Sequence, residues 1–184
     1  SSLTLTATSS IAADEDITVS ISTSGTGTEG TDYSTISDIT ISAGATTGTA
    51  SFTPTDDSVY EGNETGIVAI ATVSGGSATE DGTQSVTITI TENESSPTIT
   101  LATSATSIAE NAGSSLTLTA TSSIVADEDI TVSISTSGTG TEGTDYSTIS
   151  DITISAGDTT GTASFTPSDD SVYEGNETGI VAIS

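Results

Sequence analysis

Hydrophobic and polar residues alternate along most of this chain. In residues 3–7 the apolar positions Leu3, Leu5 and Ala7 are separated by threonine, and residues 17–21 follow the same pattern. A period of two residues predicts β-strands that bury one face, and further strands are predicted at 39–41, 49–53, 66–73, 86–90 and 97–102. These segments are rich in Ile, Val and Thr and are separated by Gly, Asp and Asn, which favours antiparallel pairing. No segment has the period of a helix.

An internal repeat organises the whole sequence. Residues 1–71 recur as residues 114–184, an offset of 113, and only four pairs differ: Ala12/Val125, Ala45/Asp158, Thr55/Ser168 and Ala71/Ser184. About seven short strands in a period of this length predict tandem immunoglobulin-like antiparallel β-sandwiches with Greek-key connections, an all-β fold. We place the modules at 1–94 and 95–184. The first is expected to lack its first strand and the second its last, so chain continuation or strands from neighbouring subunits would complete them.

The composition excludes most kinds of active-site chemistry. The 184 residues include 26 Asp and Glu but no Lys, Arg, His or Cys, which gives a formal net charge of −26. Histidine- or cysteine-based catalysis and thiolate or imidazole metal sites are therefore impossible, and we expect no enzyme activity. Nucleic acids need a basic surface, which is absent. No apolar run reaches the ~20 residues of a membrane span, so direct membrane insertion is not expected.

The acidic residues gather in a few segments that the strand pattern places in loops. The densest segment is 56–64, repeated as 169–177, and single acids stand at Asp32, Asp145 and Glu110. A further group, residues 92–94, follows the strand predicted at 86–90. Carboxylates about 4 Å apart repel by ~4 kcal/mol at an effective dielectric of about 20, so converging loops favour a hard cation. Calcium takes six to eight oxygens in flexible geometry, and magnesium fits less well. Solvated acidic loops are the alternative interpretation.

Other acidic and polar motifs have simpler interpretations. Residues 14–16 and 127–129 are acidic, and we expect solvated turns there, outside any metal site. The repeated Thr-x-Thr patterns are typical of exposed strand faces. Asn63, Asn93 and Asn176 each begin an Asn-x-Ser/Thr sequon, and whether they carry glycans stays open.

Taken together, several of these motifs resemble the Calx-β family. They are Ser-Ile-Ala-Glu-Asn-x-Gly at 107–113, Gly-Thr-Asp-Tyr at 30–33, the strand containing Phe52, and Asp-Asp-x-x-x-Glu-x-x-Glu at 56–64. The resemblance covers the whole period and implies calcium (Ca²⁺) as the bound ion. The ligands it implies are Asp32, Asp56, Asp57, Glu61, Glu64, Glu92, Asn93, Glu94, Glu110, Asp145, Asp169, Asp170, Glu174 and Glu177. Ser58 and Ser171 depart from the Asp-Asp-Asp often found in that loop, and Glu-Asn-Glu at 92–94 replaces consecutive aspartates.

We therefore expect a structural calcium-binding repeat of an extracellular or cell-surface stalk, filament or adhesin. The short linker near Pro97 already restricts the chain between modules. Calcium at the module ends would stiffen the array further. The expected partners are neighbouring modules of the array, or identical subunits of a filament. Two alternatives remain, a calcium-sensing regulatory module and an adhesive or carbohydrate-binding module. The sequence does not indicate an adhesion target.

Overall fold

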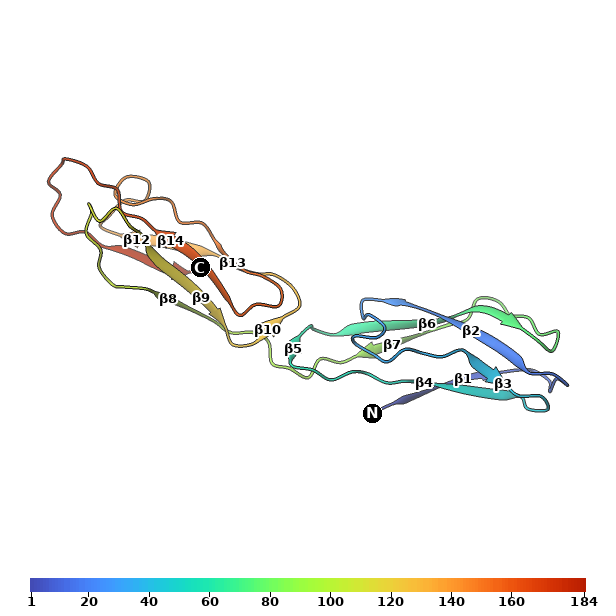
Figure 1. Ribbon diagram of the computed structural model, residues 1–184. Helices are drawn as coiled ribbons and strands as arrows, with labels where there is room; N and C mark the ends of the chain where they lie inside the picture. Colours follow the sequence, from blue (N-terminus) through green and yellow to red (C-terminus); the bar gives the residue numbers. More distant parts are fainter. The chain divides into compact units, whose positions relative to one another are not determined.

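The computed structural model describes residues 1–184 and contains strands but no helix (Figure 1). No helix is therefore present that has the length and apolar character of a membrane span. The chain forms two compact units. Residues 1–57 and 62–93 make the first unit, and residues 58–61 and 94–184 make the second. Residues 58–61, which lie inside the predicted module 1–94, are thus placed with the second unit.

The first unit contains two antiparallel sheets. β1 (Leu3–Thr8) pairs with β4 (Thr47–Phe52). The other sheet has the order β3-β2-β6-β7 and is formed by β2 (Ile17–Gly25), β3 (Ile39–Ile41), β6 (Glu64–Ser74) and β7 (Ser85–Ile90). β6 therefore lies between β2 and β7. The predicted all-β antiparallel fold is confirmed, and the strand at 39–41 has the predicted bounds.

In the second unit the corresponding strands are divided among three sheets, and one of these sheets contains an additional strand. β8 (Ile99–Thr103), β9 (Leu116–Ser122) and β14 (Thr160–Phe165) form one sheet. β11 (Ile130–Val132) pairs with β13 (Ile152–Ile154), and β12 (Ile134–Gly138) pairs with β15 (Gly179–Ile183). The strand alternation did not predict β5 (Val59–Tyr60) and β10 (Val125–Ala126). Within the second unit they form a parallel pair.

A β-bulge explains why one long strand of the first unit corresponds to two strands in the second. The pairing of β2 with β6 shifts register between Ser20 and Ile21. Asp38 accepts a hydrogen bond there from the Ile21 N–H, with 3.0 Å between nitrogen and Oδ1. In the second unit Asp151 accepts the Ile134 N–H at 2.9 Å, where β11 ends and β12 begins. The carboxylate satisfies a backbone donor that the bulge takes out of the ladder.

The apolar faces of the strands meet in the cores of the two units. Ile17, Val19, Ile39 and Ile41 are buried, and the residues between Ile17 and Val19 and between Ile39 and Ile41 are more exposed. In a second cluster the Phe52 ring is completely buried and stacks on Tyr33, with 4.6 Å between ring centroids. Tyr146 and Phe165 repeat this stack. Tyr33 directly follows Asp32, and Phe52 ends β4 four residues before the acidic loop at 56–64.

Candidate metal centre

The turn at residues 28–33 fixes Asp32 at one end of the first unit. Gly30 has φ 89°, a left-handed conformation that glycine adopts without steric cost. Asp32 is buried, and its Oδ2 accepts a hydrogen bond from the Thr28 N–H at 2.6 Å. The Asp32 carbonyl accepts the Thr55 N–H at 2.9 Å, which ties this turn to the following acidic loop. The burial of Tyr33 in the core therefore places the neighbouring carboxylate beside the loop.

Three carboxylates from these segments meet in the first repeat. Asp32, Glu61 and Glu64 each offer an oxygen, and these oxygens lie within 4.8 Å of one another. Glu64 begins β6, and Glu61 stands three residues before it in the acidic loop. The structure thus brings together residues that are up to 32 positions apart in sequence.

The second repeat forms the same trio. Asp145, Glu174 and Glu177 are the equivalents of Asp32, Glu61 and Glu64 at the offset of 113, and their oxygens also lie within 4.8 Å of one another. A second trio, Glu110, Asp170 and Glu174, shares Glu174 with the first. The Asp170 N–H donates to Glu110 Oε1 at 3.2 Å. Five carboxylates are therefore linked through Glu174.

The electrostatics of the second cluster show that its charges are uncompensated. Loss of hydration in the crowded loops raises the pKa of Glu174, and the negative charges of Asp145, Asp170, Glu177 and Glu110 raise this pKa further. The pKa of Glu177 is raised for the same first reason and by Asp145. The chain contains no lysine, arginine or histidine, so no side-chain cation is available to offset the repulsion.

The acidic run after β7 joins the loop of the first repeat. Glu92 Oε2 accepts the Gly62 N–H at 2.7 Å, and the Glu92 N–H donates to Asn63 Oδ1 at 2.9 Å. The Asn93 amide donates to Asp56 Oδ1 at 3.0 Å. Sequence-distant residues 56, 62–63 and 92–93 are therefore close together, as the resemblance implied. Their role as ligands stays a prediction.

Some predicted ligands lie outside the carboxylate trios. These are Asp56, Asp57, Glu92, Asn93, Glu94 and Asp169. Asp56 and Asn93 contact each other, and Asp169 is exposed. The trios therefore contain eight of the fourteen predicted residues: Asp32, Glu61, Glu64, Glu110, Asp145, Asp170, Glu174 and Glu177.

Other carboxylates serve the fold, and the sequence did not single them out. Glu29 accepts hydrogen bonds from Thr23 Oγ1 at 2.7 Å and from the Ile36 N–H at 2.6 Å. Its equivalent Glu142 accepts from Thr136 and Ile149, and these two hydrogen bonds lower the pKa of Glu142. The only sequence signal for this role is the recurrence of Glu29 as Glu142 in the same turn as a predicted ligand.

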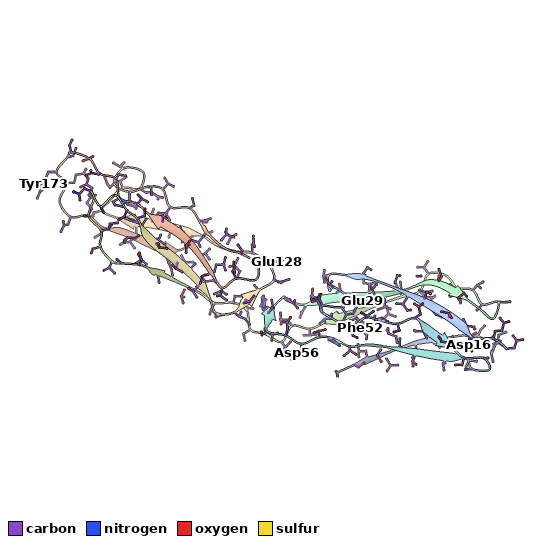
Figure 2. All side chains as sticks on the ribbon, in the orientation of Figure 1. Asp16, Glu29, Phe52, Asp56, Glu128 and Tyr173 are labelled. Atoms are coloured by element: carbon purple, nitrogen blue, oxygen red, sulfur yellow. The ribbon has the colours of Figure 1, made fainter.

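The acidic segment at 14–16 lies far from the trio, as expected. Figure 2 shows Asp16 at the end of the first unit opposite Asp56, and Glu128 at the end of the second unit opposite Tyr173. Asp16 is exposed, and its Oδ1 accepts the Ala43 N–H at 2.8 Å. The segment therefore contains a hydrogen bond that fixes a neighbouring turn, in addition to solvated side chains.

The donor set of the trios fits a hard cation. Every candidate ligand is a carboxylate or amide oxygen or a backbone carbonyl, and thiolate and imidazole donors are absent from the sequence. Three carboxylates can supply up to six oxygens when they bind in bidentate fashion, which is the lower end of the calcium range. Loops joined to strand ends allow the variable geometry that calcium tolerates better than magnesium does.

These features define a class of protein, tandem β-sandwich modules with converging acidic loops at one end of each repeat. The model of the Calx-beta domain family matches the chain twice, at residues 2–94 and 92–184, and the chain belongs to this family. The match confirms the family that the motifs indicated.

The solved structures that resemble this chain include two crystal structures of low sequence identity. The crystal structure of CBD12 from CALX1.2 is 16% identical, with a TM-score of 0.42, and the match covers 90% of this chain and 68% of that chain. The crystal structure of calcium binding domain CBD12 of CALX1.1 is 14% identical, with a TM-score of 0.42, and the match covers 92% and 70%. The family assignment depends on the family model alone. Among curated proteins, none matches this chain.

Proposed function

We propose that this chain is a calcium-binding structural repeat, in which each module holds calcium between its acidic loops. The observation that supports the proposal most strongly is the recurrence of one carboxylate trio in both repeats. Asp32, Glu61 and Glu64 converge in the first repeat, and Asp145, Glu174 and Glu177 converge in the second. A fold that holds like charges together at two places, with no cation in the sequence, is stabilised by a bound metal ion.

The structural role follows from how the ion would act on the loops. Without a cation, the raised pKa of Glu174 reports that its ionised form is disfavoured in the fold. A calcium ion at this position replaces repulsion by attraction and joins the turn before β13, the loop before β15 and the segment near Glu110. The loops would become rigid parts of each module, as a stalk or filament requires.

We place the chain outside the cell or on the cell surface as part of the proposal. Extracellular calcium modules have dissociation constants of about 10⁻⁴–10⁻³ M, which suit a medium rich in calcium. Only four of 71 paired positions differ between the two repeats. This near-identity fits an array in which every module has the same function. A sensing module is the second candidate function, and an affinity near or below about 10⁻⁶ M would favour it.

Calorimetric titration of the chain with calcium tests the proposal. We expect binding at one or more sites per repeat, and Glu61→Gln together with Glu174→Gln should remove most of the binding heat. Glu15→Gln together with Glu128→Gln is the matched control, because it removes the same charge from exposed loops outside the trios. Equal losses in both double variants, or no binding by the unaltered chain, would contradict the proposal.

A further inference from the structure

The turn between β6 and β7 contains the only aspartate of this chain that precedes a glycine. Asp81 and Gly82 are adjacent, and every other aspartate precedes a larger residue. Isoleucine or threonine follows five of them, namely Asp16, Asp38, Asp129, Asp151 and Asp158. A β-branched side chain crowds the backbone nitrogen beside it, whereas glycine has no side chain. Asp81 is therefore the aspartate whose side-chain carbon the following backbone nitrogen approaches with the least steric hindrance.

The fold leaves this pair of residues free to move. β6 ends at Ser74 and β7 begins at Ser85, so the pair lies outside the strand ladder. Asp81 and Gly82 are both exposed. Gly82 has φ 67°, and a Cβ added there would meet no atom within 4 Å. None of the backbone hydrogen bonds of the turn has the Gly82 N–H as its donor. The Gly82 nitrogen therefore approaches the Asp81 side chain without breaking a contact.

The carboxylate of Asp81 is also unrestrained. No hydrogen bond of the structure ends on it. Serine, the next smallest residue, follows Asp57 and Asp170 in the two acidic loops. Asp170 Oδ1 accepts the Val172 N–H at 2.7 Å, and Asp170 belongs to a carboxylate trio. Asp81 thus combines the smallest following residue with a side chain that is free to rotate.

Gln84 contacts the turn at the backbone carbonyl of Asp81. Its Nε2 donates a hydrogen bond to this carbonyl oxygen at 2.6 Å. The Gln84 N–H donates to Glu80 Oε1 at 2.9 Å, and the Gln84 carbonyl accepts the Ile70 N–H at 3.2 Å. These backbone contacts fix Gln84 at the end of the ladder. A donor placed on a carbonyl oxygen stabilises the negative charge that develops there when a nucleophile attacks the carbonyl carbon.

We propose that Asp81–Gly82 is a site of spontaneous isoaspartate formation in the folded protein, and that Gln84 directs the reaction toward isoaspartate. In the first step the Gly82 nitrogen attacks Cγ of the protonated Asp81 carboxyl group. A bond forms between this nitrogen and Cγ, and the carboxyl hydroxyl leaves with the amide proton as water. The product is a cyclic succinimide that joins the two residues. No group is oxidised or reduced, and water is the only other species.

In the second step water opens the succinimide at one of its two carbonyl carbons. Attack at Cγ restores Asp81. Attack at the former peptide carbonyl breaks its bond to the Gly82 nitrogen and leaves a free carboxylate, so that the peptide bond then runs through Cγ. Gln84 donates to the carbonyl whose attack gives isoaspartate. The backbone between β6 and β7 gains one methylene group, and the net charge is unchanged.

Prolonged incubation of the whole chain in water enriched in the heavy oxygen isotope tests the proposal. The pH is kept between the ordinary aspartate pKa of about 3.9 and neutrality, so that part of the carboxyl is protonated. Each ring opening leaves a heavy oxygen in aspartate or isoaspartate, and peptide mapping by mass spectrometry locates both. We expect at least roughly tenfold more label at Asp81 than at Asp57 or Asp170, because serine hinders the attacking nitrogen. Asp81→Glu, which keeps the charge but would require a larger ring, is the matched control and should remove the label.

Two outcomes would overturn the site. One is equal labelling of Asp81, Asp57 and Asp170. The other is labelling of a free peptide of residues 78–85 without labelling of the folded chain, since the fold would then protect the pair. The outcome is independent of the proposed calcium function, because Asp81 belongs to none of the carboxylate trios.

A second variant tests the role of Gln84 as a positioning residue. Gln84→Ala removes the amide donor and keeps the backbone N–H that contacts Glu80. The ratio of labelled isoaspartate to labelled aspartate should fall roughly threefold, the effect of one hydrogen bond near the lower end of its usual range. A purely structural role would change the amount of label at residue 81 and leave this ratio as it is. An unchanged ratio would therefore overturn the assignment of Gln84.

Discussion

Glu92 accepts a hydrogen bond from the Gly62 N–H, with 2.7 Å between Oε2 and the nitrogen. This contact joins the end of β7 to the acidic loop of the first repeat, across 30 residues of sequence. Because Glu92 follows β7 and Gly62 precedes β6, the pairing of these two strands places Glu92 beside the acidic loop. The position of the acidic loop therefore depends on the packing of the β-sandwich, and substitutions in the core should change the conformation of the loop.

Gly66 should not tolerate a side chain. A Cβ at this position would lie 2.7 Å from Cε2 of the Phe52 ring, which is completely buried. We expect Gly66→Ala to lower the free energy of unfolding by about 1–3 kcal/mol, as overpacking does. Denaturant unfolding followed by circular dichroism measures the change.

The equivalent change in the second repeat is the control for Gly66→Ala. A Cβ at Gly179 would also lie 2.7 Å from Cε2 of Phe165, but Phe165 is only partly buried and has room to move. Gly179→Ala should therefore cost less than Gly66→Ala. Equal costs would show that the greater exposure of Phe165 does not relax the packing around its ring.

The stability of the metal-free chain should fall as pH rises above the ordinary glutamate pKa of 4.5. The pKa values of Glu174 and Glu177 are raised in the fold, so the folded state binds more protons than the unfolded state in the window just above 4.5. Unfolding free energy decreases with pH wherever the folded state holds the extra protons. Melting temperatures in EDTA across this window measure the slope, and Glu174→Gln with Glu177→Gln should flatten it. An unchanged slope in this double variant would contradict the assignment.

Glu142 should show the opposite dependence on pH. Hydrogen bonds from Thr136 and Ile149 hold the pKa of Glu142 below its ordinary value, so the ionised carboxylate stabilises the fold. This contribution is present above pH 4.5 and is lost as pH falls through the lowered pKa. Glu142→Gln should therefore lower the melting temperature at neutral pH, and the difference from the unaltered chain should shrink in acid. Glu128→Gln, in an exposed loop, is the control and should have little effect at either pH.

The strands could be predicted because their pattern is local. Ile39 and Ile41 are buried and Thr40 between them is exposed, so the alternation alone defines the strand. β5 and β10 were missed because each has two residues, and Val59 pairs with Val125, 66 positions away. No local pattern reports such a pairing. Their identification required the three-dimensional structure.

The candidate site also contains residues that the sequence could predict and residues that it could not. The acidic loops could be predicted from charge density and family resemblance, including Asp32, Glu61 and Glu64. The role of Glu29 could not, because it depends on a backbone conformation that brings the Ile36 N–H to its carboxylate. Carboxylates that support a turn and carboxylates that converge look alike in sequence. Only the structure shows that the oxygens of Asp32, Glu61 and Glu64 lie within 4.8 Å of one another.

Thermal unfolding with and without calcium tests the central claim most directly. The chain is melted in EDTA and in about 10 mM calcium, a decade above the upper end of the expected range of dissociation constants. Equal ionic strength and equal magnesium are the controls for general screening of the −26 charge. At ~100 times the dissociation constant, each occupied site adds about 2.7 kcal/mol. We predict a rise of several degrees that calcium produces and magnesium does not, and that Glu61→Gln with Glu174→Gln removes. A melting temperature that responds equally to both ions, or to neither, would mean that solvent and salt alone balance the acidic loops.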